Sequence, residues 1–191
     1  MNKFILSAAL LWAAAAGLAH AEKADSSKPT EIKFDQLEVD DVKQTKTAIG
    51  NVILTRGTLQ MKSPKAVMKE DPEGYQYVTM TSTPGTPATF RQKRDGEGDQ
   101  WVEGQADRIE YDGKTELVKL FSNAQIRRLE AGKPSDEVRG EFISYDSRKE
   151  FFSVKNTATG ESKPGAGRGT MVIQPSNKNL APAASVPPAG K

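Results

Sequence analysis

Aspartates recur at fixed intervals along this chain, and they are the residues with the clearest potential for chemistry. The recurring positions are Asp35, Asp40, Asp107, Asp112 and Asp146. A pair of carboxylates can act as general acid and base, and several carboxylate oxygens together can bind Ca²⁺. Recurrence at one place in similar phrases is, however, what turn chemistry produces, because Asp accepts hydrogen bonds from backbone N–H groups in turns. The pattern therefore favours turn and bend roles, and it predicts no catalytic residue and no metal site.

Imidazole and thiol groups are almost absent. The chain has no Cys, and its one His is His20, close to the N-terminus. This composition argues against Ser-His-Asp and Cys-His sites, most zinc sites and all disulfides, so no cofactor is expected. Basic and acidic side chains nearly balance, at 27 and 25, which gives a formal net charge of +2. A balanced charge argues against nucleic-acid binding, which needs a concentrated positive field.

Basic side chains form two short clusters whose role stays open at this stage. They are Arg91, Lys93 and Arg94 in one cluster, and Arg127 and Arg128 in the other. Guanidinium groups match phosphate geometry, so these residues could bind phosphates, although solvated outer faces are their ordinary location. Trp101 could lie as an anchor at the rim of a binding site, or it could simply pack against neighbouring side chains.

The two ends of the chain differ in composition from its middle. Residues 1–21 read "MNKFILSAALLWAAAAGLAHA", with one Lys, an apolar run and a small-x-small site before the expected cleavage between Ala21 and Glu22. A membrane anchor is the alternative, but the apolar run is short for a span of about 20 residues. We therefore expect an exported protein. Residues 22–29 and 176–191 are poor in apolar residues or rich in Pro, Ala and Ser, which predicts a flexible linker and a disordered tail.

Between these ends, apolar residues alternate with polar ones. Pairs such as Ile32 and Phe34, Val78 and Met80, or Ile143 and Tyr145 lie two residues apart, and turn residues separate them. This period is typical of β-strands with one buried face, so residues 30–175 are predicted to form one all-β domain. The phrases "YDGK" (111–114) and "YDSRK" (145–149) resemble hairpin tips, and Asp-Gly suits a left-handed turn.

The alternating phrases also repeat when the chain is aligned with itself. One alignment, which we call the long shift, places Asp35 on Asp107 and also Asn51 on Asn123. A second, which we call the short shift, places Tyr111 on Tyr145. Similarity among alternating strands can arise by chance, but the shared Asp and Asn positions favour true repeats. Repeated hairpins stack on one another, because a single hairpin cannot bury its own apolar face.

Four phrases resemble the LptA/OstA-like family of periplasmic lipopolysaccharide transport proteins. They are "GNVILTRGTLQM", "PATFRQ", "VEGQADRIEYD" and "LFSNAQIRR", and the resemblance runs in order from residue 32 to residue 173. The family implies an open, twisted β-jelly roll of short antiparallel strands and a periplasmic bridge that carries lipopolysaccharide from the inner to the outer membrane. LptC-like modules, which keep a membrane helix, and LptD N-terminal-like modules, which precede a barrel, are alternatives. The cleavable-looking leader and the lack of a barrel favour the LptA type over both.

An apolar groove would serve that role, because acyl chains exposed to water cost about 25 cal/mol per Å². Alternating strands can line such a groove with one face, although the same residues could instead form a packed core. Residues that share the inward phase are expected to line the groove: Ile32, Phe34, Leu37, Val39, Val52, Leu54, Leu59, Met61, Phe90, Ile109, Tyr111, Leu120 and Ile126. Glu38, Lys119 and Arg127 take the outward phase.

Assembly is expected at the two ends of the roll, because open sheet edges recruit other strands. The expected edges are residues 31–39 and residues 168–175, and contact between them would build a head-to-tail filament. The resemblance implies an LptC-like partner at the N-terminal edge and an LptD-like partner at the C-terminal edge. Two other classes remain as alternatives: an enzyme with a carboxylate pair in a cleft, and a structural strand-addition module with a filled interior.

Overall fold

The computed structural model describes residues 25–96 and 98–175. The expected signal peptide 1–21, its cleavage site between Ala21 and Glu22 and the expected tail 176–191 lie outside the described residues. None of the described residues forms a helix that is long and apolar enough to cross a membrane.

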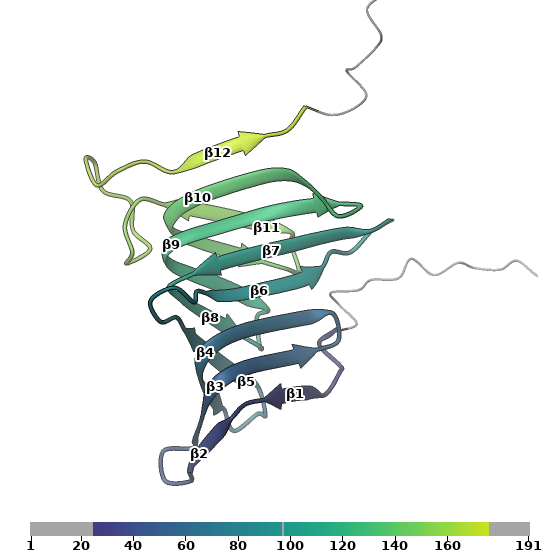
Figure 1. Cartoon of the computed structure of the whole chain (residues 1–191), viewed down its shortest axis with the longest axis vertical. Coiled ribbons are helices and arrows are strands. Elements are labelled where there is room, and N and C mark those ends of the chain that lie inside the picture. The colour runs from purple at the N-terminus through teal and green to yellow at the C-terminus, as the bar shows by residue number, and fades with distance from the viewer. Residues whose placement is uncertain (1–24, 97, 176–191) are drawn as a thin grey trace, which may run out of the picture.

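Twelve antiparallel strands form one continuous sheet (Figure 1). Their bounds are β1 (Thr30–Lys33), β2 (Gln36–Asp40), β3 (Thr45–Arg56), β4 (Leu59–Glu70), β5 (Gln76–Thr81), β6 (Ala88–Lys93), β7 (Gln100–Ala106), β8 (Arg108–Asp112), β9 (Leu117–Glu130), β10 (Lys133–Asp146), β11 (Phe151–Lys155) and β12 (Thr170–Ile173). The all-β prediction is confirmed. The strands are not all short, however, because β3 and β4 have 12 residues each and β9 and β10 have 14.

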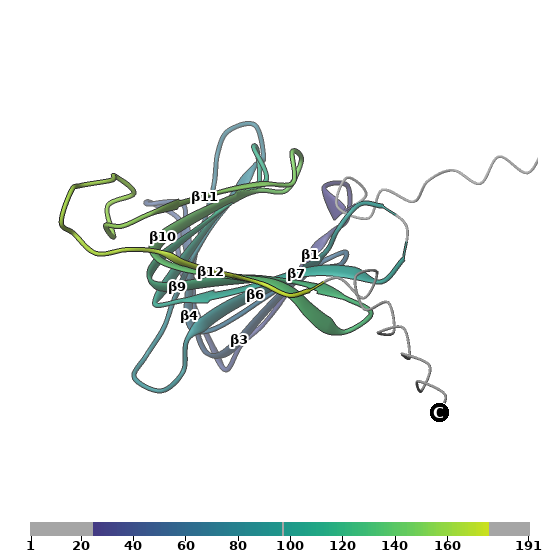
Figure 2. The ribbon, with the colours of Figure 1, turned by 90° about the horizontal axis from the view of Figure 1, so that it is seen from above.

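The long strands bend and fold the sheet into two layers. The front layer of Figure 1 has the order β1-β3-β4-β6-β7-β9-β10-β12, and the back layer has the order β2-β3-β4-β5-β8-β9-β10-β11. Figure 2 shows the two layers diverging from their shared bend. We call the opposite side, where the free margins of the two layers meet, the seam. Four strands thus contribute to both layers, which is how twelve strands make an open jelly roll.

Left-handed residues form the bends, and they recur as the repeat predicts. Asn51 in β3 and Asn123 in β9 have φ angles of 44° and 52°. Asn51 donates a hydrogen bond of 2.8 Å to Asp35, and Asn123 donates one of 2.8 Å to Asp107. Each Asp lies where the chain passes from one layer to the other, between β1 and β2 or between β7 and β8. The two pairs make the same hydrogen bond at two bends. The long shift therefore relates positions that are equivalent in the structure.

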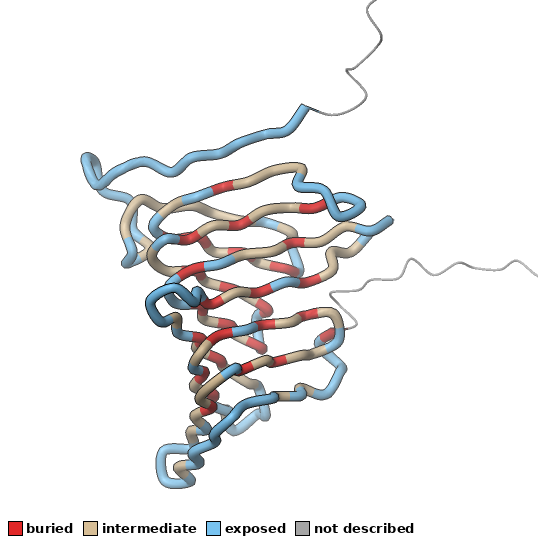
Figure 3. The backbone as a smooth tube through the Cα atoms, in the orientation of Figure 1, coloured by how far each residue is buried: buried red, intermediate tan, exposed pale blue. Residues whose placement is uncertain are grey.

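Small side chains fill the inner side of the bend. Five alanines there are exposed by no more than 1%: Ala48, Ala66, Ala88, Ala106 and Ala124. Their size lets the two layers approach where they join, and larger apolar residues fill the wider space beyond. Figure 3 shows the buried positions concentrated in the middle strands, with exposed chain at both ends of the sheet.

Part of the predicted linker 22–29 is described, from Asp25 onward, and this residue contacts the sheet. Asp25 is buried and accepts hydrogen bonds from the backbone N–H of Thr58 at 2.7 Å, from its hydroxyl at 2.6 Å and from the Gln92 amide at 3.1 Å. Arg56 also donates to the Asp25 carbonyl at 3.1 Å. The composition of this segment is polar, but one carboxylate satisfies the orphan donors of the β3–β4 turn and anchors it.

Candidate functional site

The inner faces of the two layers carry continuous rows of apolar side chains. Residues directly opposite in antiparallel strands share a face, so strand register defines these rows. In the front layer one row is Ile32, Leu54, Met61, Phe90, Gly104, Ile126, Val138 and Met171. In the back layer one row is Leu37, Ala48, Ala66, Met80, Ile109, Leu120, Ile143 and Val154. Alternation along each strand therefore becomes an apolar interior that runs the length of the molecule.

The middle of this interior is packed. Nine of the residues predicted to line a groove are exposed by 7% or less: Val52, Leu54, Leu59, Met61, Phe90, Ile109, Tyr111, Leu120 and Ile126. The rings of Phe90 and Tyr145 stack across the interior with centroids 6.3 Å apart. Gly104 makes room for them, because a Cβ there would lie 2.3 Å from Phe90 Cε1. These residues face inward as predicted, and here they form a core; their contact with lipid stays a prediction.

The N-terminal end of the interior is open. Ile32, Val39 and Met68 line a hollow of about 410 Å³ there. Phe34, Leu37 and Val39 are 39%, 40% and 54% exposed. Leu37 and Val39 share the inner face with Ala48 and Lys46, their partners in β3, and both are only partly covered. We call this hollow and its exposed apolar residues the N-terminal mouth.

Charged groups surround the N-terminal mouth. Lys46 stands on the inner face between Val39 and Met68, while Asp40, Asp41 and Asp71 line the rim. The backbone N–H and the ammonium of Lys43 lower the pKa of the Asp40 carboxyl below its ordinary value, because both interact with the carboxylate. An apolar floor with a charged rim suits a ligand that has both an apolar and a polar part.

Towards the C-terminal end, the space around Tyr145 is nearly filled. A hollow of about 10 Å³ lies between Tyr145, Phe152 and Val138. The Arg128 guanidinium lies 5.1 Å from the centroid of the Phe152 ring, which closes this end from the seam side. Beyond it, Met171 and Ile173 of β12 are 51% and 69% exposed.

Arginines of the front layer hold the seam shut. Arg94 makes an ion pair of 2.5 Å with Glu150 of the back layer, and Arg128 donates to the Glu150 carbonyl at 3.4 Å. Arg56 donates to the Tyr111 hydroxyl at 3.4 Å, and burial raises the pKa of this phenol. Side-chain contacts, and no backbone ladder, therefore connect the two margins at these three points.

The recurring aspartates have turn and bend roles, as predicted. Asp40, Asp112 and Asp146 each accept hydrogen bonds from backbone N–H groups of the turn that follows them. The left-handed residue of these turns is the last one, Gln44, Glu116 or Glu150, and not Gly113 as the Asp-Gly phrase suggested. Gly113 is needed for another reason: a Cβ there would lie 2.7 Å from the Gln76 carbonyl oxygen. In the described part of the chain, no three Asp, Glu, His or Cys side chains gather as a metal site would require.

The list of expected groove residues left out several residues of this site. Met68, Val138, Tyr145 and Phe152 complete the interior, and the short shift, which relates Tyr111 to Tyr145, could have indicated two of them. Arg56 and Arg128 are related by the long shift, and both reach into the seam. The pairing of Arg94 with Glu150 joins residues 56 positions apart and has no local sequence signal.

A single sheet folded around an apolar interior, open at one end and flanked by free edges, defines an open β-jelly roll. The family model described as LptA/(LptD N-terminal domain) LPS transport protein matches residues 31–151. The chain belongs to this family.

Named relatives agree with this assignment. The lipopolysaccharide export system protein LptA of Haemophilus influenzae is 30% identical over 175 residues, which are 92% of each chain. LptA of Escherichia coli K12 is 30% identical over 151 residues, which are 79% of this chain and 78% of that protein. The crystal structure of LptH, the LptA homologous periplasmic component of the lipopolysaccharide transport device from Pseudomonas aeruginosa, matches with a TM-score of 0.67 at 24% identity. It covers 79% of this chain and 99% of that chain, and it shows the fold.

Proposed function

We propose that this protein is a periplasmic, non-enzymatic carrier that binds lipopolysaccharide and passes it from the inner to the outer membrane through its apolar interior. The family and the names of the relatives support this function. One structural observation carries it: an apolar row of the inner face continues from the packed middle through Ala66 and Ala48 to Leu37 at the exposed N-terminal mouth. Covering the exposed Phe34, Leu37 and Val39 would be favourable by about 25 cal/mol per Å² of apolar surface.

Acyl chains would enter where the inner face is already open and extend along the interior. In the structure described here the middle is filled, so lipid must displace side-chain packing there. The seam is the place where the layers can separate, because the contacts described across it come from side chains, whereas the bend is continuous backbone. The saccharide would remain outside, next to the charged rim of the mouth.

Photo-crosslinking tests this proposal within a single strand. Leu37 and Val39 of β2 face inward, and Glu38 between them faces outward with Thr47. A photoreactive amino acid at 37 or 39 should capture lipopolysaccharide, and one at 38 should not. Leu120 and Lys119 give the same comparison in the middle of the interior. Equal capture on both faces would contradict the proposal.

The filled middle favours one second candidate, a structural strand-addition module that carries no lipid. Side chains at the centre of the interior, such as Met61 and Leu120, are fully buried. The same experiment separates the two functions. Capture at neither the mouth nor the centre, in a protein that is folded and was expressed with lipopolysaccharide present, would support the structural module.

We further propose that the protein assembles head to tail through its sheet edges. At the N-terminal end the free edges are β1 and β2, and at the C-terminal end they are β11 and β12. The sequence predicted only the β12 edge at that end. An LptC-like protein would pair with β1 or β2, an LptD-like protein with β11 or β12, and another copy of the chain with either end. Strand addition would then join the interior of one copy to that of the next.

Truncation tests the assembly. Removing residues 169–191 deletes β12 but leaves β11, β10 and the interior rows in place. Sedimentation over a range of concentrations should show head-to-tail multimers for the parent and weaker association for the truncated form. A truncated form that associates as strongly as the parent would exclude β12 as the joint.

A further inference from the structure

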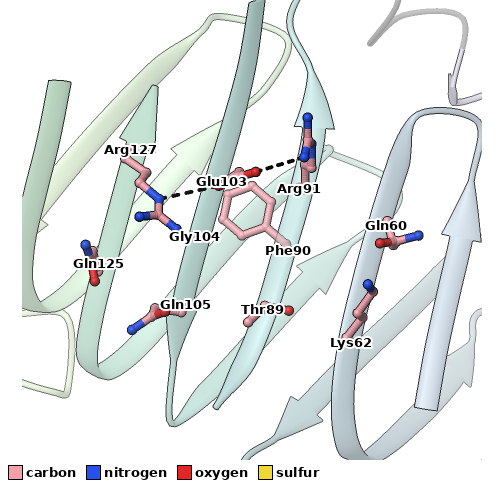
Figure 4. A pocket seen from close by; sticks show the side chains of 10 residues that line it. All are labelled: Gln60, Lys62, Thr89, Phe90, Arg91, Glu103, Gly104, Gln105, Gln125 and Arg127. Atoms are coloured by element: carbon pink, nitrogen blue, oxygen red, sulfur yellow. Dashed lines mark ion pairs between the residues drawn. The ribbon is translucent and has the colours of Figure 1, made fainter. Parts of the chain in front are cut away.

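A second hollow lies on the outer face of the front layer, separate from the apolar interior. Its volume is about 260 Å³, and β4, β6, β7 and β9 form it (Figure 4). Side chains reach it in two parallel rows, because residues two positions apart on a strand share a face. We call it the outer hollow.

The first row is charged. Gln60, Arg91, Glu103 and Arg127 lie directly opposite one another across four strands. Glu103 lies between the two arginines, 3.2 Å from Arg91 Nη1 and 3.4 Å from Arg127 Nε. Each guanidinium has five N–H donors, so most of them stay available beside the hollow. Arg91 also lies over the ring of Trp101, 4.2 Å from its centroid.

The second row is polar. Lys62, Thr89, Gln105 and Gln125 lie opposite one another two residues further along each strand. In the described part of the chain, none of these four side chains has a hydrogen-bond or ion-pair partner, and the same holds for Gln60. Three carboxamides, one hydroxyl and one ammonium are therefore free to bind a ligand from the same side.

The floor of the outer hollow is backbone that the core holds in place. Phe90 and Gly104 lie between the two rows, and the Phe90 ring points inward. Phe90 and Leu120 occupy the inner space beneath Gly104. A Cβ at position 104 would lie 2.3 Å from Phe90 Cε1 and 2.9 Å from Leu120 Cδ2. The hollow is thus preformed, and its lining polar groups are held on a rigid sheet.

We propose that the outer hollow binds an acidic saccharide. Carboxamide groups can both donate to and accept from sugar hydroxyls, and the Glu103 carboxylate can accept hydrogen bonds from them. Three cationic side chains against one carboxylate leave a positive field that selects a phosphate or carboxylate substituent on the sugar. The phosphorylated sugars of a lipopolysaccharide and the uronic acids of another glycan share this chemistry. The site does not depend on lipid binding in the interior.

Trp101 provides the measurement. It is the only tryptophan of the chain from residue 22 onward, and replacing Trp12 by Phe gives the same single reporter in an uncleaved chain. Tryptophan fluorescence would be titrated with an acyl-free phosphorylated core oligosaccharide, a galacturonic acid oligomer and a neutral dextran oligomer. We expect a saturable change with one or both acidic sugars and none with dextran, and the effect should weaken with salt. Binding of the core alone would identify lipopolysaccharide as the source, and binding of both would indicate acidic glycans in general.

A matched pair of variants locates the site. Lys62→Gln should weaken binding about tenfold, because a hydrogen bond to a charged group is lost. Lys65→Gln removes the same charge from the same strand, but on the outer face of the back layer, and should leave binding unchanged. No saturable binding of either acidic sugar, or equal binding by Lys62→Gln and the parent, would overturn the proposal. Neither outcome would affect capture of lipid at Leu37, so failure of this site is distinguishable from failure of the carrier function.

Discussion

The two ends of the interior are made from the same alternating pattern, but the described hollows at these ends differ greatly in volume. At the N-terminal mouth, the inner face leaves Leu37 and Val39 about half exposed around a hollow of about 410 Å³. Towards the C-terminal end, Tyr145 and Phe152 occupy the corresponding inner positions and leave about 10 Å³. Val39, Tyr111 and Tyr145 are related by the repeat, so equivalent positions carry a small side chain at the open end and large rings at the closed end.

The difference shows which features of the interior follow from the alternation of apolar and polar residues and which do not. Alternation decides which side chains face inward. Openness depends on side-chain volume and on whether the other layer extends over the same region. β1 has only four residues, so little of the front layer faces β2. A carrier needs both properties, because an entrance must be accessible and a conduit must exclude water.

The largest expected effect separates the packed middle from the mouth. Phe90→Ala would leave a cavity under the Tyr145 ring and should lower the free energy of unfolding by about 3–5 kcal/mol. Phe34→Ala removes the same group from a side chain that is 39% exposed, and it should cost less than about 1 kcal/mol. Urea denaturation of both variants measures the difference. Similar losses would mean that Phe34 is covered, and that the mouth is closed in solution.

An intermediate effect is expected at the seam. Glu150→Gln removes the charge that pairs with Arg94, whose side chain is only 14% exposed. Loss of this partner should lower the free energy of unfolding by about 1–3 kcal/mol, because a largely buried guanidinium is left without its carboxylate. Urea denaturation of Glu150→Gln, compared with that of Glu161→Gln, measures this loss in the free energy of unfolding.

Glu161 is a suitable control because its ion pair with Lys163 is exposed, at 69% and 62%. Exposed pairs contribute between about 0 and 1 kcal/mol. Equal effects of the two substitutions would show that the seam is solvated and that Arg94 does not hold the layers together. A double-mutant cycle with Arg94→Ala would then give no coupling.

Much of this architecture could be predicted from local sequence. Period-two alternation predicted the strands and the inward set, and the spacing of Asp35, Asp107 and their asparagines predicted the repeat and the bends. These features depend on residues that are close in sequence or placed by strand register. The edge at 168–175 was likewise visible as a short apolar run before Pro175.

Other features could not be predicted, because they depend on three-dimensional packing. Whether Met61 or Leu120 is packed or exposed depends on the opposite layer, which no local pattern describes. Asp25 looked like part of a polar linker, and only the turn at Thr58 gives its carboxylate a role. The outer hollow combines residues of four strands, and each of them alone resembles an ordinary solvated position.

The smallest expected effect compares the bend at the N-terminal end with the bend in the middle of the sheet. Asn51→Ala and Asn123→Ala each remove a hydrogen bond of 2.8 Å to an Asp, and each places Ala at a positive φ angle. Both should lower the free energy of unfolding by about 1–2 kcal/mol, and Gly at either position should recover part of the loss by relieving the strain. Thermal or urea unfolding of the four variants measures this. Equal losses at the two sites would show that the N-terminal bend and the middle bend are alike, so that side-chain size and coverage alone make the N-terminal mouth open. A loss at Asn123 with none at Asn51 would show instead that the N-terminal bend is already loose, and the openness of that end would then be a property of its backbone.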